Sequence, residues 1–250
     1  MSKLLLDIGN TRAKAAVYDN GEILERVATT SPSQLEIGRL CSLYGVDAAI
    51  ASVVGTRPDF QSLLPASLLE NFHQLTHNSR MPISIDYDTP QTLGMDRVAA
   101  AVGARQLCPD GALVVVDAGS CITIDLLDSD NRYRGGAILP GLLFRLRALH
   151  DYTAALPLVE LSPGERNGDT ATPMTGRSTR ESIIAGVCNA SLFEIEGFIN
   201  AYKELCGDVK LFLTGGDAVF FAKQLFFPNF ANSDLVFIGL NKILEMNTIH

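Results

Sequence analysis

"LLLDIGNTRAKAAVYDNGEI", residues 4–23, runs from a short apolar segment into an aspartate, a glycine and small polar residues. An alternating stretch follows and ends at Asn20-Gly21, a strong signal for a two-residue hairpin turn. With residues 21–30, this pattern predicts three antiparallel strands at the start of the chain. A hairpin needs no carboxylate at its turn, so Asp7 requires another explanation.

The same pattern returns at residues 112–136, "ALVVVDAGSCITIDLLDSDNRYRGG". Aligning Asp7 with Asp117 superposes LLLDIGNT on VVVDAGSC, and each motif leads into a second strand and a turn. A repeat of this length predicts two similar domains that face each other. The Cys-Pro-Asp-Gly segment at 108–111 is typical of a boundary, which places the domains at 1–110 and 111–250.

The remaining periodic segments predict alternating helices and strands. Helices are expected at 33–44, 59–71, 96–107, 141–150, 178–206 and 217–225, and strands at 46–54 and 209–218. No apolar run approaches the ~20 residues that span a bilayer, so we expect no transmembrane segment. The N-terminal apolar run is too short for a signal peptide, which makes the cytoplasm the expected compartment.

Composition narrows the class of function. The chain has 250 residues, of which 47% are hydrophobic and 19% charged, as expected of a soluble globular protein. Its net charge of -8 argues against a nucleic-acid groove, so any positive charge for an anionic ligand must be local. Five widely spaced cysteines without a C-x-x-C pair indicate free thiols in a reducing compartment.

Both Asp-Gly turns have a chemical interpretation. A strand-end carboxylate followed by glycine and small polar residues offers backbone N–H groups to phosphate and a hard oxygen to a cation, and Lys14 adds a positive charge. One such turn alone is better interpreted as an ordinary tight turn. Two copies, with the Thr214-Gly215-Gly216 loop, favour a nucleotide triphosphate held in a cleft between two domains. The chain contains neither a P-loop nor a G-x-G-x-x-G motif.

A second group of residues lies at 87–105, where Asp96 and Arg97 follow Gly94 at a loop-to-helix junction. Phosphoryl transfer to an alcohol needs a carboxylate for the hydroxyl proton and a cation for an anionic substrate. The alternative is a helix N-terminal aspartate with an incidental arginine beside it. Further on, Ser178 with Glu181 predicts a capping box, so the hydroxyls there either cap a helix or contact a ligand.

Seven motifs in order resemble those of type III pantothenate kinases. They are DIGNTRAK (7–14), GMDR (94–97), DAGSCITID (117–125), GGAILPG (135–141), GRST (176–179), LTGG (213–216) and DLVFIGL (234–240). The resemblance implies the actin-like ATPase fold, an α/β architecture of two ribonuclease-H-like domains with mixed five-stranded sheets flanked by helices. It also implies ATP-dependent phosphorylation of pantothenate to 4′-phosphopantothenate, the first step of coenzyme A biosynthesis.

The resemblance further assigns roles to residues. Asp96 would be the proton acceptor, Asp117 would bind a potassium or ammonium ion, and Mg²⁺ would accompany the triphosphate. Pantothenate would be contacted by Tyr87, Gly94, Met95, Asp96, Arg97 and Thr179. ATP would be contacted by Asp7, Ile8, Gly9, Asn10, Thr11, Arg12, Ala13, Lys14, Ser120, Thr214, Gly215 and Gly216. The family is typically homodimeric, with the partner completing the pantothenate pocket.

One departure and two alternatives remain at this stage. Ser120 stands where the family usually has threonine, so the hydroxyl is kept and the methyl is lost. Another kinase or phosphohydrolase of the same superfamily would share both turns but act on a different alcohol. A non-catalytic accessory or regulatory protein could keep the fold and lose the catalytic aspartate. The presence of Asp96, Arg97 and Asp117 favours an enzyme.

Overall fold

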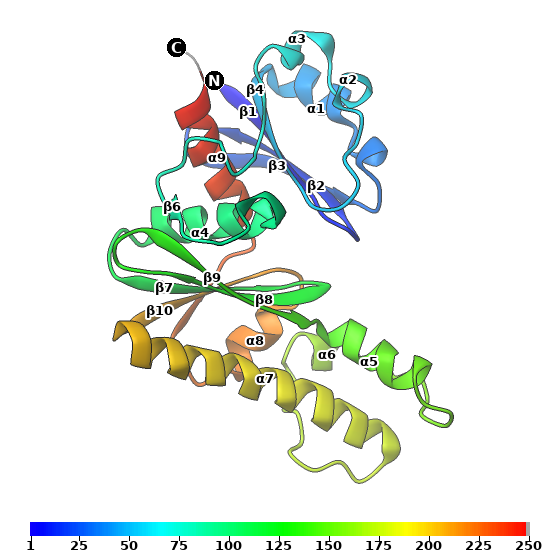
Figure 1. The fold of residues 1–250 in the computed structure, drawn as a ribbon. Coiled ribbons are helices and arrows are strands. Elements are labelled where there is room, and N and C mark those ends of the chain that lie inside the picture. The colour runs from blue at the N-terminus through cyan, green and yellow to red at the C-terminus, as the bar shows by residue number, and fades with distance from the viewer. Residues whose placement is uncertain (249–250) are drawn as a thin grey trace. The chain divides into compact units, whose positions relative to one another are not determined.

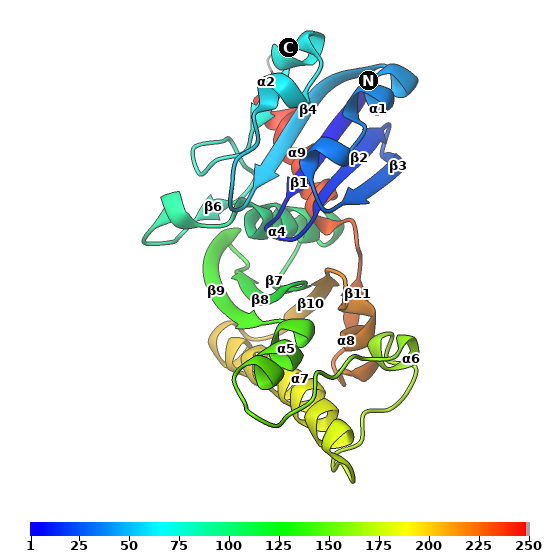
Figure 2. The ribbon, with the colours of Figure 1, turned by 90° about the vertical axis from the view of Figure 1, so that its right-hand side faces the viewer.

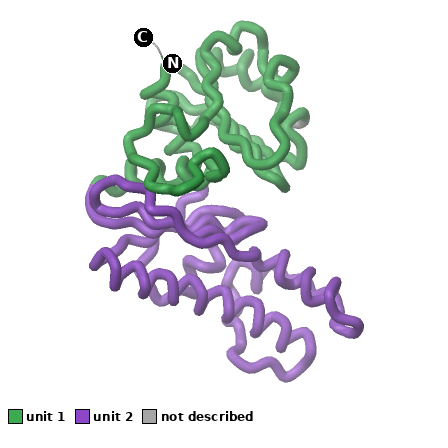
Figure 3. The backbone as a smooth tube through the Cα atoms, viewed as in Figure 1, with its two compact units in different colours: residues 1–109, 234–250 green, residues 110–233 purple. Residues whose placement is uncertain are grey.

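The computed structural model describes residues 1–248, apart from the side chain of Gln34. The chain forms two compact units (Figure 3): unit 1 comprises residues 1–109 and 234–250, and unit 2 comprises residues 110–233. The first boundary lies close to the expected one. The second domain was expected to continue to residue 250, whereas helix α9 (Leu235–Asn247) packs against helix α4 (Met95–Leu107) within unit 1.

Unit 1 is built on a mixed five-stranded sheet in the order β3-β2-β1-β4-β5, in which β1 pairs antiparallel with β2 and parallel with β4 (Figure 1). The strands of this sheet are β1 (Ser2–Ile8), β2 (Ala13–Asp19), β3 (Glu22–Thr29), β4 (Val46–Val53) and β5 (Phe72–Gln74). A further short strand, β6 (Ser84–Ile85), lies outside this sheet. Its other helices are η1 (Pro32–Gln34), α1 (Ile37–Tyr44), α2 (Phe60–Leu63), α3 (Ala66–Leu69) and η2 (Pro90–Thr92).

Both faces of this sheet are covered, which explains the continuous apolar run at the start of β1. Leu4 and Leu6 pack in a core with residues of α1, α2 and α3. The opposite face, which carries Lys3 and Leu5, lies against α9: Lys3 Nζ donates to Asn241 Oδ1 at 2.7 Å. Strands covered on both sides read as apolar runs rather than alternating patterns.

Unit 2 repeats the arrangement, with its strands in the order β11-β10-β7-β8-β9. They are β7 (Ala112–Ala118), β8 (Cys121–Leu127), β9 (Arg132–Pro140), β10 (Val209–Thr214) and β11 (Asn229–Ala231). Its helices are α5 (Leu142–Asp151), α6 (Pro163–Arg166), α7 (Thr179–Cys206) and α8 (Ala218–Gln224). The antiparallel triple β7-β8-β9 corresponds to β1-β2-β3, and the parallel neighbours β10 and β11 correspond to β4 and β5. The predicted duplication is therefore confirmed at the level of strand order.

Helix α7 crosses one face of the unit 2 sheet (Figures 1 and 2). By length and composition it is the one helix in residues 1–248 that could span a membrane, although the sequence predicted none. Of its apolar 18-residue window, 56% is buried inside the structure. Ile184, Ile195 and Ile199 belong to the unit 2 core, and this accounts for the apolar composition.

Two expected elements differ in detail. The helix expected at 59–71 is two short helices, α2 and α3, separated by Leu64 and Pro65. Proline removes a helical N–H, and it disfavours helical geometry at the residue before it. The strand expected at 209–218 ends at Thr214, because Gly215 adopts a φ of +94° and starts the loop into α8.

The contact between α4 and α9 depends on two glycines. A Cβ on Gly239 would lie 1.8 Å from the carbonyl oxygen of Ala99, and a Cβ on Gly103 would lie 2.0 Å from that of Leu235. The backbones of the two helices therefore meet directly. Only glycine permits this approach.

Gly239→Ala is expected to destabilise the protein, because the new methyl group can be accommodated only by moving α9 away from α4. The free energy of unfolding should fall by roughly 1–3 kcal/mol, the usual cost of overpacking, or more. Urea denaturation measures this directly. The control is Gly38→Ala in α1, where a Cβ meets nothing within 4 Å, and it should stabilise slightly. Equal stability of both variants would contradict the close packing.

Candidate functional site

In unit 1, Asp7 lies near the end of β1, between polar side chains on the two adjacent strands. The strand registers place Lys14 of β2 and Ser52 of β4 directly beside it. Ser52, fully buried, donates its hydroxyl to Asp7 Oδ1 at 2.9 Å, and Lys14 Nζ lies 3.5 Å from Asp7 Oδ2. Asp7 is 9% exposed, and the hydroxyl and ammonium compensate for the burial of its carboxylate.

The turn after Asp7 is tight and presents its polar residues to solvent. The Gly9 N–H donates to the Arg12 carbonyl at 3.0 Å, which leaves Asn10, Thr11 and Arg12 exposed. Gly55, with a φ of +88°, supports this turn from the end of β4, because a Cβ there would lie 2.3 Å from Asn10 Oδ1. The sequence analysis identified residues 7–14 but missed Ser52 and Gly55.

Unit 2 contains the corresponding row of side chains. Asp117 of β7 stands in register with Thr123 of β8 and Thr214 of β10. Thr214 thus occupies the position that Ser52 holds in unit 1, and Thr123 the position of Lys14. The Oγ1 atom of Thr123 is buried and has no hydrogen-bond partner among the described residues.

Glycines enclose the Asp117 turn. Gly119 N–H donates to the Cys121 carbonyl at 3.0 Å, as Gly9 does in the first turn. A Cβ on Gly215 would lie 2.4 Å from Asp117 Oδ1 and 2.5 Å from the Ala118 carbonyl oxygen. A Cβ on Gly141 would lie 2.3 Å from the Gly119 carbonyl oxygen. The structure therefore brings together Asp117, Ser120 and the 214–216 loop, and it adds Gly141, which the sequence analysis did not single out as a site residue.

Asp217 and Arg166 form a further polar pair next to this loop. Asp217 is 5% exposed, its N–H donates to the Ala118 carbonyl at 2.9 Å, and Arg166 Nε donates to its Oδ1 at 3.0 Å. The pair fixes the end of the 214–216 loop against β7. Sequence reasoning had no signal for it, because Arg166 lies on the four-residue helix α6.

Asp96 lies in the first turn of α4. Its Oδ1 accepts a hydrogen bond from the Arg97 N–H at 2.9 Å, and a Cβ on Gly94 would lie 2.6 Å from the same oxygen. The positive end of the helix dipole favours a carboxylate here. Arg97 is 7% exposed and Met95 6%, whereas Tyr87 is half-buried in the preceding loop. These residues all belong to unit 1.

Thr179 is exposed at the N-terminus of α7 in unit 2. Ser178 caps the helix by accepting from the Glu181 N–H at 3.2 Å. The reciprocal half of the predicted capping box is absent, because Glu181 Oε2 accepts from the Arg177 N–H instead. Arg180 anchors this end by hydrogen bonds that lower the pKa of Glu165 to about 2.

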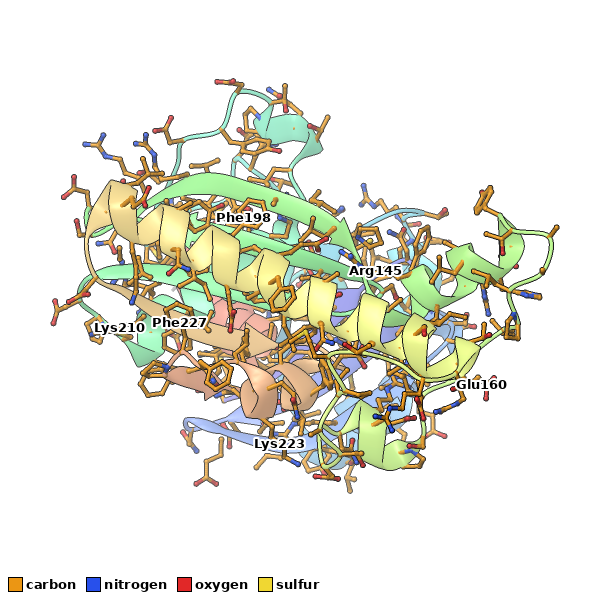
Figure 4. All side chains as sticks on the ribbon, turned by 90° about the horizontal axis from the view of Figure 1, so that it is seen from below. Arg145, Glu160, Phe198, Lys210, Lys223 and Phe227 are labelled. Carbon is orange, nitrogen blue, oxygen red and sulfur yellow. The ribbon has the colours of Figure 1, made fainter. Side chains whose placement is uncertain are left out.

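Beside Thr179, an open groove of about 730 Å³ runs between α5 and α7. Its walls are mainly apolar and include Leu149, Ile183 and Val187. Arg145, labelled in Figure 4, lies at this groove and joins α5 to α7: its Nη1 donates to Glu194 Oε1 at 3.0 Å. The groove is separate from the Asp117 turn in its lining residues, and the sequence analysis did not predict it.

The residues at the two Asp-Gly turns offer mainly oxygen and nitrogen atoms as ligands. Residues 1–248 contain no cluster of three or more histidine, cysteine, aspartate or glutamate side chains that could hold a metal ion. The five cysteines form no disulfide, and burial raises the pKa of the Cys188 thiol to about 11, which keeps it protonated. Turns of this kind suit phosphate groups, whose charge is met by backbone N–H groups and a lysine.

The family model for type III pantothenate kinase matches residues 3–201. Curated type III pantothenate kinases from Phocaeicola vulgatus and Flavobacterium johnsoniae are each 39% identical to the chain. The alignments cover 98% and 97% of this chain and the same shares of the relatives. The match therefore extends over essentially the whole length of both proteins.

Solved structures agree in fold. A Campylobacter jejuni protein, provisionally assigned to the Baf family of transcriptional activators, is 26% identical, with a TM-score of 0.62 and coverage of 98% of both chains. The activator of 2-hydroxyisocaproyl-CoA dehydratase from Clostridium difficile, solved with bound ADPNP, has a TM-score of 0.59 at 14% identity, over 98% of this chain and 94% of its own. The second likeness concerns the fold alone, and the expected actin-like ATPase architecture is confirmed. Because the family model and the curated relatives both match along the chain, the protein belongs to the type III pantothenate kinase family.

Proposed function

We propose that the chain transfers the γ-phosphoryl group of ATP to the primary hydroxyl of pantothenate, giving 4′-phosphopantothenate for coenzyme A biosynthesis. The observation that carries this proposal is the match to curated type III pantothenate kinases over about 98% of the chain. The residue roles below are argued from the geometry of each unit.

Asp96 acts as the proton acceptor. Its Oδ1 accepts a hydrogen bond from the Arg97 N–H at 2.9 Å, which orients the carboxylate, and the carboxylate in turn orients the substrate hydroxyl. An alcohol is a weak acid, so the proton reaches Asp96 late in the transfer and positioning carries much of the rate enhancement. Tyr87 and the segment 94–97 contact pantothenate, with the Arg97 guanidinium suited to a carboxylate.

The two Asp-Gly turns bind the phosphates of ATP. Backbone N–H groups of the exposed 10–12 segment and the Lys14 ammonium compensate negative charge in unit 1. In unit 2, Ser120 is exposed and the Gly215 backbone lies against Asp117, which leaves room for a phosphate to approach the loop. Ser120 supplies the hydroxyl that threonine supplies elsewhere in the family.

Two ions accompany the nucleotide in this proposal. Mg²⁺ would be held by Asp7 together with phosphate oxygens and water, and it supplies charge neutralisation on the triphosphate. A potassium or ammonium ion would be held at Asp117, whose carboxylate supplies the negative charge and hard oxygen that such an ion binds.

We further propose that the protein is a cytoplasmic homodimer. The α5–α7 groove is open and apolar, and Phe144 and Tyr152 of the same region are 62% and 88% exposed. Apolar surface of this kind often marks an interface. A partner that covers this groove would also bury Thr179, and this would complete a binding pocket around an otherwise exposed residue.

A second candidate function, transcriptional regulation, is suggested by the family assignment of the Campylobacter jejuni structure. The net charge of -8 disfavours direct binding to DNA. One assay separates the candidates: purified protein with ATP, Mg²⁺ and pantothenate, with and without potassium or ammonium. Formation of 4′-phosphopantothenate supports the kinase, and its absence under every condition contradicts the proposal.

Asp96→Asn should lose turnover by a factor of about 10² to 10⁴, the usual contribution of a positioned acid or base. The asparagine oxygen can still accept from the Arg97 N–H, so the fold and the ATP affinity should remain. Steady-state kinetics and calorimetric ATP titration measure the two effects. Near-normal turnover would remove Asp96 from this role.

Ser52→Ala should lower kcat/KM for ATP by a factor of about 10 to 100, because Asp7 loses the buried hydroxyl that orients it, a bond worth roughly 1.5–3 kcal/mol to a charged group. The KM for pantothenate should change little. Ser62→Ala is the matched control: Ser62 donates to Asp59 Oδ2 at 2.6 Å on the exposed helix α2. If both variants behave alike, Ser52 has no special role at Asp7.

Tyr152→Glu should convert the dimer to a monomer, because it places a charge in the groove that the partner covers. Light scattering after size-exclusion chromatography gives the mass of wild type and variant. Phe226→Glu is the control, since Phe226 is 96% exposed but does not line the groove. A monomeric wild-type protein at micromolar concentration, or a Tyr152→Glu variant that stays dimeric, would contradict this interface.

A further inference from the structure

The internal repeat allows the two aspartate rows to be compared position by position. In each unit the aspartate ends the central strand, and a hydroxyl residue stands beside it on the parallel neighbour, Ser52 in unit 1 and Thr214 in unit 2. On the antiparallel neighbour the rows differ, because unit 1 has Lys14 and unit 2 has Thr123. At this position, then, unit 1 supplies a covalently attached ammonium group and unit 2 a hydroxyl.

The Thr123 hydroxyl has no internal role. Its Oγ1 is buried and makes no hydrogen bond within the described residues. Leaving a buried hydroxyl unpaired costs roughly 1–3 kcal/mol, so such a group needs a partner from outside the chain. Residues directly opposite in an antiparallel pair share a face, with Cβ atoms about 4.5–5.5 Å apart, so Thr123 stands beside Asp117.

We propose that Thr123 Oγ1 is a ligand of the monovalent cation at Asp117, and that this cation takes the place in unit 2 that the Lys14 ammonium takes in unit 1. The inference rests on the proposed function for the presence of the cation. What is new is that Thr123 is a ligand of this cation, and that the cation and the Lys14 ammonium occupy equivalent positions in the two units.

The chemistry of the equivalence is simple. The head of a lysine side chain is a compact cation with three N–H donors. An ammonium ion has the same charge and one more donor, and potassium offers the same charge to oxygen ligands. Lys14 Nζ lies 3.5 Å from Asp7 Oδ2, and an ion between Asp117 and Thr123 would be in the corresponding position. Threonine at 123 therefore makes room for a free ion where a lysine would exclude it.

The deciding experiment measures ion binding rather than turnover. Thallium(I) nitrate is titrated into the purified full-length protein and followed by thallium NMR, with potassium as competitor. Thr123→Val has the same shape without the hydroxyl. It should bind thallium at least about tenfold more weakly, because the ion loses one oxygen ligand and such a contact to a charge is worth about as much as a hydrogen bond. Thr123→Ser, the matched control, should stay within about twofold of wild type.

Thermal denaturation without added ions separates this role from a structural one. Because the hydroxyl is unpaired, Thr123→Val should unfold at the same temperature as wild type or higher. A lowered unfolding temperature with unchanged thallium affinity would show that Thr123 serves the fold, and would overturn the inference. Thallium binding that is absent in wild type would overturn it as well.

Thr123→Lys tests the equivalence itself. The introduced ammonium should abolish thallium binding and, in the kinase assay, make turnover independent of potassium and ammonium. A folded Thr123→Lys variant that still binds thallium with wild-type affinity would overturn the equivalence, and Thr123→Val decides the ligand whether or not the lysine variant folds.

The proposed function and this inference fail in different ways. If wild type binds thallium and Thr123→Val does not, while no phosphopantothenate is formed, the ligand assignment stands and the proposed function fails. If wild type is a potassium-dependent pantothenate kinase and Thr123→Val binds thallium normally, the function stands and the ligand assignment fails.

Discussion

A nearly buried carboxylate at the end of a central strand constrains everything around it. Asp7 is 9% exposed, and a charge removed from water in this way must be met by hydrogen bonds or an opposite charge. Strand register provides both, with the Ser52 hydroxyl on one side and the Lys14 ammonium on the other. The antiparallel and parallel pairings of β1 are thus fixed by the site as well as by the core, because a one-residue slip would turn these side chains to the other face.

The position of helix α4 depends on its packing against helix α9. Helix α4 carries Asp96 and is packed backbone to backbone against α9 through Gly103 and Gly239. A contact without intervening side chains leaves little freedom for α4 to shift, since protein interiors are close-packed. The motif at 234–240 therefore serves the proposed active site through packing, although its residues belong to the opposite end of the sequence.

Local patterns in the sequence predicted much of this architecture, and non-local pairings account for what it missed. The repeat of apolar run, Asp and Gly identified both turns and the duplicated strand order, because each motif is contiguous. Ser52, Gly55 and Gly141 were missed because they reach the turns only through strand pairing or close backbone approach. Helix α9 was not among the expected helices, and its contact with α4 is likewise non-local, since sequence periodicity does not show the unit against which a helix packs. The break at Pro65, by contrast, was readable from the sequence.

The duplication also separates what the fold needs from what the chemistry needs. Features present in both units, such as the hydroxyl on the parallel neighbour and the N–H of the turn glycine bonded to a carbonyl, are requirements of an aspartate at a strand end followed by a reversing turn. A feature present in only one unit is not required by the fold that the two units share. Position 14 and position 123 differ in charge while their backbones are paired alike, so the fold accepts either residue. In the proposed function, the choice between lysine and threonine therefore follows from what the two carboxylates bind.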